Sequence, residues 1–214
     1  IPVSTFGKKL DFDNLLGFSK KHNLKILFDT AACHDPKIFN FIKKKEINFC
    51  FSFNGNKTLT TGAGGMFSSN SKSISSRVRM LANVGKKSKK YDYETVGFNY
   101  KMTNVQASLG ISQLNNIKNI LNIKRKIFNN YNKYFLNLKD IKLITNQNYI
   151  NWVFAVMVKS YKEFKKLQNA FIKSGIQMDL FWKPLHLQKP YTKFKKSNLN
   201  NTHSIWKKVV VLPS

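Results

Sequence analysis

The sequence predicts a mixed α/β protein in two parts. Short apolar runs, typical of buried strands, alternate with segments whose apolar residues recur every three or four positions, as in amphipathic helices. A second order of strand, helix and strand begins beyond about Asp140 and indicates a smaller α/β domain. Hydrophobic residues make up 42% of the 214 residues, which is enough to bury a sizeable core.

The first elements expected are a helix and two strands. The helix covers 10–22, where apolar residues follow a helical spacing and Asp11 lies near the start. Residues 25–28 are almost wholly apolar and lead into Asp29, as expected of a strand that is buried on both faces. Residues 47–53 alternate apolar and other side chains, which predicts the next strand.

A loop, a short strand and two helices follow. The loop of small and polar residues covers 54–65, and 66–69 fits a short antiparallel return. Residues 71–84 are expected to be helical, and Thr103 or Asn104 can cap the helix after them. The inner face of that capped helix is expected to carry Ala107, Ile111 and Leu114.

The remaining elements complete the second part of the chain. A long helical pattern covers 117–135. Residues 152–158 predict a strong strand, 163–174 a helix and 178–182 a second strand. The chain stops directly after a strand-like run at 209–212 and lacks an initiator Met, so it is expected to begin and end inside a larger protein. Its first residues lack the charged start and apolar stretch of a signal peptide.

The net charge of +27 comes from 37 lysines and arginines against 10 acidic residues. Such a charge suggests nucleic-acid binding, and a lysine-rich nucleic-acid-binding domain is one alternative for the function. However, nearly all the positive charge is lysine, whereas arginine makes the bidentate contacts to bases and phosphates. The lysines are also spread along the whole chain beside many Asn, Ile and Phe residues, a bias that an A/T-rich coding sequence would produce. Runs such as 43–45 and 86–90 are therefore expected to be solvated surface, without specific nucleic-acid binding.

The two cysteines, Cys33 and Cys50, are too few for a disulfide framework and fit a reducing compartment, so a cytoplasmic location is expected. Cys33, His34 and Asp35 could suggest a metal site, but adjacent residues point in different directions on a helix or a strand. The other histidines show no ligand spacing, so no metal is expected. No apolar run reaches the roughly 20 residues needed to span a bilayer, and a soluble protein without membrane association is expected.

Asp29 and Lys57 stand out because each follows a predicted strand. Ligands of parallel α/β sheets bind beyond the carboxyl ends of the strands, where Asp29 lies, although a helix cap or a turn is the alternative role. Lys57 lies in a loop of Gly, Asn and Thr, where partial shielding could let it lose its proton and attack a carbonyl. A solvated surface lysine is the alternative there. Together they are the two groups that pyridoxal phosphate (PLP) requires, since a carboxylate keeps its pyridine nitrogen protonated and an amine holds its aldehyde.

Several segments resemble, in order, the signatures of the DegT/DnrJ/StrS sugar aminotransferases, which are PLP enzymes of fold type I. The four main segments are 26–32, 51–58, 61–65 and 97–107. Two further stretches that resemble the family are 2–7 and 182–188. The resemblance therefore covers nearly the whole chain.

This resemblance implies two domains and a transferase activity. Residues 1–118 would be the C-terminal portion of a large PLP-binding domain with a mainly parallel sheet, and 119–214 a smaller, truncated α/β domain. The reaction would be transamination of a keto-sugar linked to a nucleoside diphosphate, with glutamate as the amino donor, for surface-polysaccharide or glycoconjugate sugars. Sugar dehydratases of the family carry histidine in place of the lysine, so Lys57 favours the aminotransferases. A catalytically inactive or regulatory member of the same fold is the alternative.

Carried over onto this sequence, the resemblance implies a cofactor site of four residues. Asp29 would bind the pyridine nitrogen, Lys57 would form the Schiff base and Ser52 would hydrogen-bond the cofactor phosphate. Asn99 would reach the cofactor phosphate of the neighbouring subunit, which implies a homodimer with shared active sites.

In the small domain, the resemblance implies that His186 and Lys183 contact the substrate, with packing and surface roles as the alternative. Trp182 is expected in the core. Three positions depart from the family pattern. The family often has an acidic residue where this chain has Phe28, and usually Gln, Glu or His where it has Ala32. It commonly has Arg where this chain has Lys101. The family's N-terminal part, with its phosphate-cradling turn and ring-stacking aromatic residue, is absent from this chain, which leaves the activity of the chain by itself open.

Overall fold

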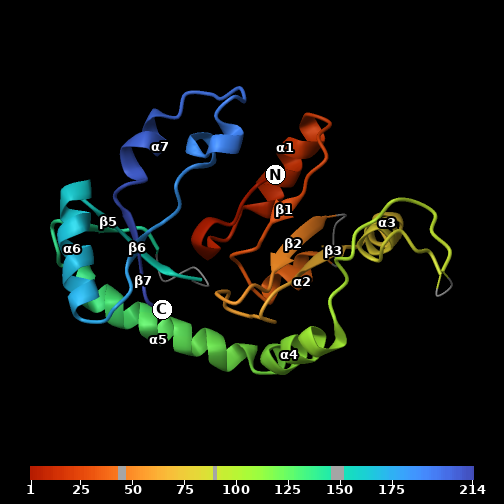
Figure 1. The fold of residues 1–214 in the computed structure, drawn as a ribbon, viewed down its shortest axis with the longest axis horizontal. Coiled ribbons are helices and arrows are strands. Elements are labelled where there is room, and N and C mark those ends of the chain that lie inside the picture. Colours follow the sequence, from red (N-terminus) through yellow and green to blue (C-terminus); the bar gives the residue numbers. More distant parts are fainter. Residues whose placement is uncertain (43–46, 89–90, 146–151) are drawn as a thin grey trace. The chain divides into compact units, whose positions relative to one another are not determined.

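The computed structural model describes residues 1–42, 47–88, 91–145 and 152–214. The chain divides into two compact units, Ile1–Asn122 and Ile123–Ser214 (Figure 1), called unit 1 and unit 2 below. The assignment of 1–118 to a PLP-binding domain and of 119–214 to a small domain stays a prediction.

Among its described residues, unit 1 contains a three-stranded sheet in the order β1–β2–β3. Its strands are β1 (Phe28–Asp29), β2 (Asn48–Ser52) and β3 (Gly65–Ser69). β1 runs parallel to β2, with Asp29 opposite Cys50, and β3 returns antiparallel, with Gly65 opposite Ser52. β2 and β3 lie where the sequence predicts them, whereas the apolar run at 25–28 pairs with β2 only from its last residue onwards.

The helices expected in unit 1 are confirmed, and their capping residues explain where two of them begin. The helical elements are η1 (Thr5–Gly7, a 3-10 turn), α1 (Phe12–Lys21), α2 (Lys37–Ile42), α3 (Lys72–Ala82), α4 (Asn104–Asn115) and α5 (Ile117–Phe135), which crosses into unit 2. At the start of α1, the Asp11 carboxylate accepts a hydrogen bond from the Asn14 N–H at 3.1 Å. Thr103 and Gln106 form a reciprocal capping box at the start of α4.

The core of unit 1 is aromatic. Alternation along β2 buries Phe49 and Phe51 on the same face of the strand. Phe12 of α1 packs edge-on against Phe28 and Phe49, with ring centroids 5.1 and 5.4 Å apart. Burying each ring contributes about 1.5–3 kcal/mol, so this cluster holds β1 and β2 side by side and sets the position of both strand ends.

Unit 2 contains an antiparallel sheet, and its order among the described residues is β4–β5–β7–β6. Its elements are β4 (Ile141–Leu143), β5 (Phe154–Val158), α6 (Tyr161–Lys173), β6 (Asp179–Leu180), η2 (Leu185–Leu187), η3 (Lys189–Tyr191), α7 (Asn200–Ile205) and β7 (Val209–Leu212). The predicted order of strand, helix and strand is confirmed, and β7 lies between its two strands. Phe154 of β5 is buried between Phe128 of α5 and the other apolar side chains of this core.

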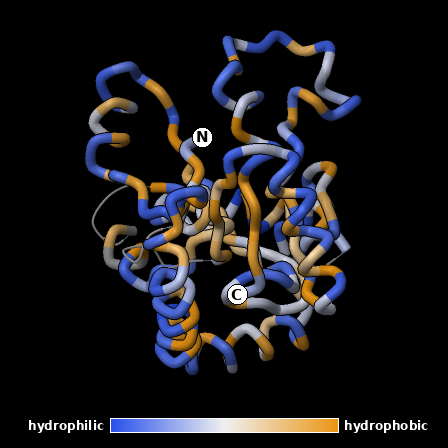
Figure 2. Tube along the Cα trace, turned by 90° about the vertical axis from the view of Figure 1, so that its left-hand side faces the viewer, coloured by the Kyte–Doolittle hydropathy of each residue, from blue (hydrophilic) through white to orange (hydrophobic). Residues whose placement is uncertain are grey.

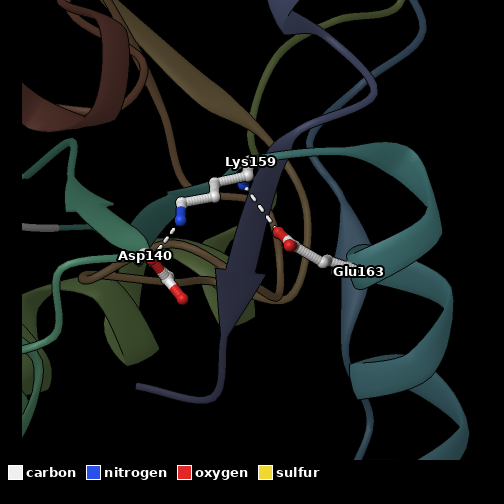
Figure 3. A network of polar contacts seen from close by, with 3 residues as sticks. All are labelled: Asp140, Lys159 and Glu163. Atoms are coloured by element: carbon white, nitrogen blue, oxygen red, sulfur yellow. Dashed lines mark hydrogen bonds and ion pairs between the residues drawn. The ribbon is translucent and has the colours of Figure 1, made fainter.

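A polar contact connects β5 to the helix that follows it (Figure 3). Lys159, directly after β5, forms an ion pair with Asp140 through its amine, and its backbone N–H donates to the Glu163 carboxylate at 3.0 Å. Glu163 lies in the first turn of α6, where a negative charge favours the helix dipole. The Lys159 and Asp140 side chains are mostly exposed, so their ion pair contributes little to stability.

Helices α1, α3, α5 and α6 are amphipathic, whereas α4 is not. Figure 2 shows hydrophilic and hydrophobic residues mixed along the chain. In the described parts of the chain, no helix combines the length and the apolar character needed to cross a membrane.

Candidate active site

The predicted cofactor residues of the strands gather at one edge of the sheet in unit 1. Because β1 and β2 are parallel, their carboxyl ends lie at the same edge. Asp29 is the last residue of β1 and Ser52 is the last residue of β2. This edge is where parallel α/β sheets bind their ligands.

Asp29 is held by contacts on both sides of its backbone. Its N–H donates to the Pro2 carbonyl and its carbonyl accepts from the Ser4 N–H, both at 2.9 Å. One carboxylate oxygen, Oδ1, accepts from the Ala31 N–H at 2.9 Å. The turn role that the sequence left open is therefore present. It occupies Oδ1, and Oδ2 makes no hydrogen bond with the described residues.

Lys57 lies in the loop after β2, where its backbone N–H donates to the Asn54 carbonyl at 3.0 Å. Its side chain is half-buried. Burial lowers the pKa of the Lys57 amine below its ordinary value, and the charge of Asp29 acts in the opposite direction. Asp29 ends β1 and Lys57 follows the end of β2, which runs parallel to β1, so both residues belong to the same edge of the sheet. The structure therefore brings together the two groups that the sequence singled out.

The loop that carries Lys57 is held by α4. The side-chain amide of Gln113 binds both polar groups of the Thr60 backbone: it accepts from the N–H at 3.0 Å and donates to the carbonyl at 2.8 Å. Gly110, one turn earlier, lets the helix approach closely, because a Cβ atom there would lie 2.9 Å from the Thr61 methyl group. The position of the loop thus depends on a residue 53 positions away from Thr60 in the sequence.

Ser52 ends β2 beside the start of β3. Its hydroxyl accepts a long hydrogen bond of 3.4 Å from the Asn54 N–H. Opposite it stands Gly65, where a Cβ atom would lie 2.6 Å from the Phe51 carbonyl oxygen, so this part of β3 packs against β2 without a side chain. The phosphate-binding role predicted for Ser52 stays a prediction.

His34 is a site residue that the sequence reasoning missed. It is buried, its Nε2–H donates to the Ser52 carbonyl at 2.9 Å, and its ring stacks on Phe53. Burial lowers the pKa of His34, the hydrogen bond to Ser52 opposes this effect, and the charge of Lys57 lowers the pKa further. The ring thus links the loop after Asp29 to the end of β2. Its only sequence signal was the Cys33–His34–Asp35 run, which was weighed as a metal site.

A cavity of about 340 Å³ lies beside His34 in unit 1. Its wall is almost entirely apolar and includes Phe51, Phe53 and Met102. The residues predicted for the inner face of α4 also line it; these are Ala107, Ile111 and Leu114. The predicted face of α4 therefore lines this cavity but is not buried, since Ile111 is 61% exposed and Leu114 48% exposed.

Asn99 lies on an exposed segment whose backbone pairs with the residues at the end of α3. It pairs with Asn83, and the neighbouring Tyr100 N–H donates to the Ala82 carbonyl at 2.9 Å. The backbone of this segment is therefore fixed while the Asn99 side chain faces solvent. Its predicted contact with the cofactor of a neighbouring subunit stays a prediction.

The residues predicted for the substrate lie in unit 2. His186, in η2, has its Nε2 atom 2.9 Å from Nε2 of His203 in α7. Lys183 is exposed, and its carbonyl accepts from the Gln188 amide at 3.1 Å. The prediction that Trp182 is a core residue is wrong: it is 60% exposed, because the chain turns just after β6 with a positive φ of 31° at this residue. The substrate contacts of His186 and Lys183 stay predictions.

Among the residues that the structure describes, no group of three or more His, Cys, Asp or Glu side chains could hold a metal ion. Burial raises the pKa of the Cys33 thiol to about 11, so this cysteine stays a neutral, apolar member of the core.

Comparisons with known proteins identify relatives over the full chain. The DegT/DnrJ/EryC1/StrS aminotransferase family matches residues 1–214. The GDP-perosamine synthase of Caulobacter vibrioides is 28% identical over 211 residues, covering 93% of this chain and 56% of that protein. This chain thus spans about half the length of the curated relatives that it matches.

Solved structures show the same fold. Helicobacter pylori PseC, an aminotransferase involved in the biosynthesis of pseudoaminic acid, matches with a TM-score of 0.85 at 18% identity, over 99% of this chain and 60% of its own. S. venezuelae DesV, solved in complex with a ketimine intermediate, matches with a TM-score of 0.83 at 25% identity, over 99% of this chain and 58% of its own. The predicted fold type I class is confirmed.

Proposed function

Because the chain belongs to the DegT/DnrJ/EryC1/StrS aminotransferase family, whose members depend on PLP, we propose that it forms part of an enzyme that aminates a nucleotide-linked keto-sugar. One observation carries this proposal: Asp29 and Lys57 lie at the shared carboxyl edge of β1 and β2, within electrostatic reach of one another. Glutamate is proposed as the amino donor. The names of relatives, such as GDP-perosamine synthase, support a substrate linked to a nucleoside diphosphate.

The residues at this edge fit PLP. When bound, the cofactor supplies an electron sink for the carbon that gains or loses the amino group. Lys57 would hold the cofactor covalently, Asp29 would pair with its pyridine nitrogen, and Ser52 would bind its phosphate. The amine, the carboxylate and the hydroxyl would thus meet the aldehyde, the pyridine nitrogen and the phosphate of the cofactor.

Lys57 has the chemistry that its proposed role demands. An amine attacks a carbon or accepts a proton only when it is neutral, and burial lowers the pKa of Lys57 towards that state. In transamination its Nζ would carry the proton between the substrate carbon and the cofactor. Asp29 stays in place through its backbone contacts and the Ala31 N–H, so its carboxylate keeps one orientation.

The homodimer with shared active sites is also part of this proposal. It is supported by the exposed side chain of Asn99, which the fixed backbone beside α3 presents to solvent. In unit 2, His186 and Lys183 are proposed to contact the sugar substrate.

Replacing Lys57 tests the function directly. In the complete protein that contains this chain, Lys57→Ala is expected to abolish the visible absorbance of the bound cofactor and to lower turnover by at least about a hundredfold. Lys159→Ala, which removes an exposed lysine after another strand, is the matched control and should leave both unchanged. A normal spectrum in Lys57→Ala would overturn the assignment.

A further inference from the structure

The few arginines of this chain are not spread as its lysines are. Of the 37 basic residues only three are arginines: Arg77, Arg79 and Arg125. Arg77 and Arg79 both line one cleft of about 670 Å³ in unit 1. Arginine presents a planar fork that matches phosphate oxygens, which lysine lacks. The cleft therefore concentrates the residue type suited to phosphate in a chain that otherwise uses lysine.

The cleft is built by α3 and the turn after it. Met80 and Asn83 line it, and they lie three residues apart on one face of the helix. Arg77 and Arg79 flank this face. Beyond the helix the chain turns at Gly85, where φ is +81° and a Cβ atom would lie 1.8 Å from the Thr95 carbonyl oxygen. This tight backbone crossing fixes the second wall of the cleft.

The second wall adds positive charge. Lys86 and Lys87 line the cleft together with one acid, Glu94. Lys87 pairs with Glu94 at 2.8 Å, and both side chains are well exposed, so an anion could displace this pair at little cost. Among the described residues, neither guanidinium of α3 makes an ion pair. Four basic groups thus line the cleft with one acid, Glu94, and a second acid, Asp92, acts on Lys87 from nearby.

An aromatic rim lies next to these charges. The Lys86 amine sits 4.3 Å from the ring centre of Tyr91 and 5.1 Å from that of Tyr93. Tyr91 is 87% exposed, so it offers solvent a large flat surface. Exposed aromatic rings stack on nucleobases without regard to sequence.

We propose that this cleft binds a nucleoside diphosphate, with the diphosphate on Arg77 and Arg79 and the base against Tyr91. The choice of a nucleotide rests on the proposed function, because a nucleotide-linked sugar is the substrate that would bring a diphosphate to unit 1. The cleft would then hold the part of the substrate that does not react.

Calorimetric titration of the complete protein with UDP, GDP and inorganic pyrophosphate tests the site. Saturable binding of at least one nucleotide, tighter than that of pyrophosphate, is expected. Arg77→Gln/Arg79→Gln is expected to weaken it by about a hundredfold, because each charge-assisted contact is worth roughly a factor of ten. Arg77→Lys/Arg79→Lys keeps the charge and should still weaken binding by about tenfold, since lysine lacks the fork.

The matched control is Lys162→Gln/Lys166→Gln, which removes two charges from the exposed face of α6 in unit 2. Equal weakening in this control and in the arginine variants would overturn the proposal that the cleft binds the nucleotide. The absence of saturable binding in the unaltered protein would do the same. Pyrophosphate binding as tight as that of the nucleotides would also overturn the nucleotide assignment. The cofactor absorbance that depends on Lys57 should persist in all these variants, so a failure of the cleft is distinguishable from a failure of the proposed function.

Discussion

Lys57 in unit 1 and Lys159 in unit 2 both follow the carboxyl end of a strand, yet their amines meet opposite surroundings. Burial lowers the pKa of Lys57, whereas a hydrogen bond to Asp140 raises the pKa of the exposed Lys159. Lys57 lies in a loop held by α4 and beside a buried histidine. Position after a strand therefore does not set the pKa of a lysine, and the surrounding structure decides whether it is lowered or raised.

A third lysine shows that a lowered pKa is not enough either. Burial also lowers the pKa of Lys124, whose amine donates to the carbonyls of Trp152 and Ser214 at 3.2 and 2.8 Å. Those contacts give Lys124 a structural role. Lys57 differs because its neighbours include Asp29, whose carboxylate lies at the same edge of the sheet.

The largest effect that sharpens this comparison is expected from Gln113→Ala. The change leaves both polar groups of the Thr60 backbone without their partner, so the loop that carries Lys57 should loosen. Turnover is expected to fall by about 10- to 100-fold, mainly through kcat, because small displacements of a catalytic group are costly. Steady-state kinetics of the complete protein measure this.

The control is Gln168→Ala, which removes a comparable amide contact to the Met178 carbonyl in unit 2. It should leave kcat close to that of the unaltered protein. If Gln113→Ala left kcat unchanged, or changed only KM, the loop would not depend on α4 for its position.

The next effect concerns the pH dependence of stability. Because folding lowers the pKa of His34, the unfolded chain takes up a proton on this ring at a higher pH than the folded chain does. The contribution of His34 to the free energy of unfolding is therefore fully present above the ordinary pKa of 6.5 and is lost as the pH falls towards the folded value. Urea unfolding at several pH values between about 5 and 8 measures this slope.

His34→Phe keeps the ring that stacks on Phe53 but cannot titrate. It should flatten the slope and lower stability at neutral pH by about 1–3 kcal/mol through the lost hydrogen bond to Ser52. The same slope in the variant as in the unaltered protein would show that another group is responsible.

The smallest effect is expected at Lys159. Asp140→Asn removes the partner that raises the pKa of this lysine, so the pKa should fall towards its ordinary value in an NMR titration. Turnover and the unfolding midpoint should stay within error of the unaltered protein, because both side chains are exposed. A loss of activity here would break the contrast with Lys57.

Much of the fold could be predicted because its signals are local. Helical spacing and capping residues such as Asp11 and Thr103 indicate helices without reference to the rest of the chain. The strand predicted at 25–28 is wrong in its bounds, because β1 consists only of the two residues that pair with β2, Phe28 and Asp29. Helix α2 was missed within a polar, lysine-rich stretch, and Trp182 was misplaced because a turn, rather than hydrophobicity, decides its exposure.

The residues of the candidate site also fall into those with a local sequence signal and those without one. That Asp29 and Lys57 belong to one sheet edge could be predicted because each follows an apolar strand, whereas the roles that the family resemblance gives them stay predictions. His34 and Gln113 could not be predicted, because their roles arise from contacts with residues 18 and 53 positions away. Such contacts leave no periodic pattern in one sequence. The arginine pair of the cleft is visible in the sequence, but only the structure shows that both line one surface.

The absence of a side chain at Gly65 limits how this protein can vary over evolution. Even one methyl group there would collide with the Phe51 carbonyl and push β2 away from β3 beside Ser52. Gly17 of α1, by contrast, faces open space and tolerates a larger residue. Related sequences should therefore keep glycine at the first position and exchange it freely at the second, which makes Gly65 a marker of an intact sheet edge.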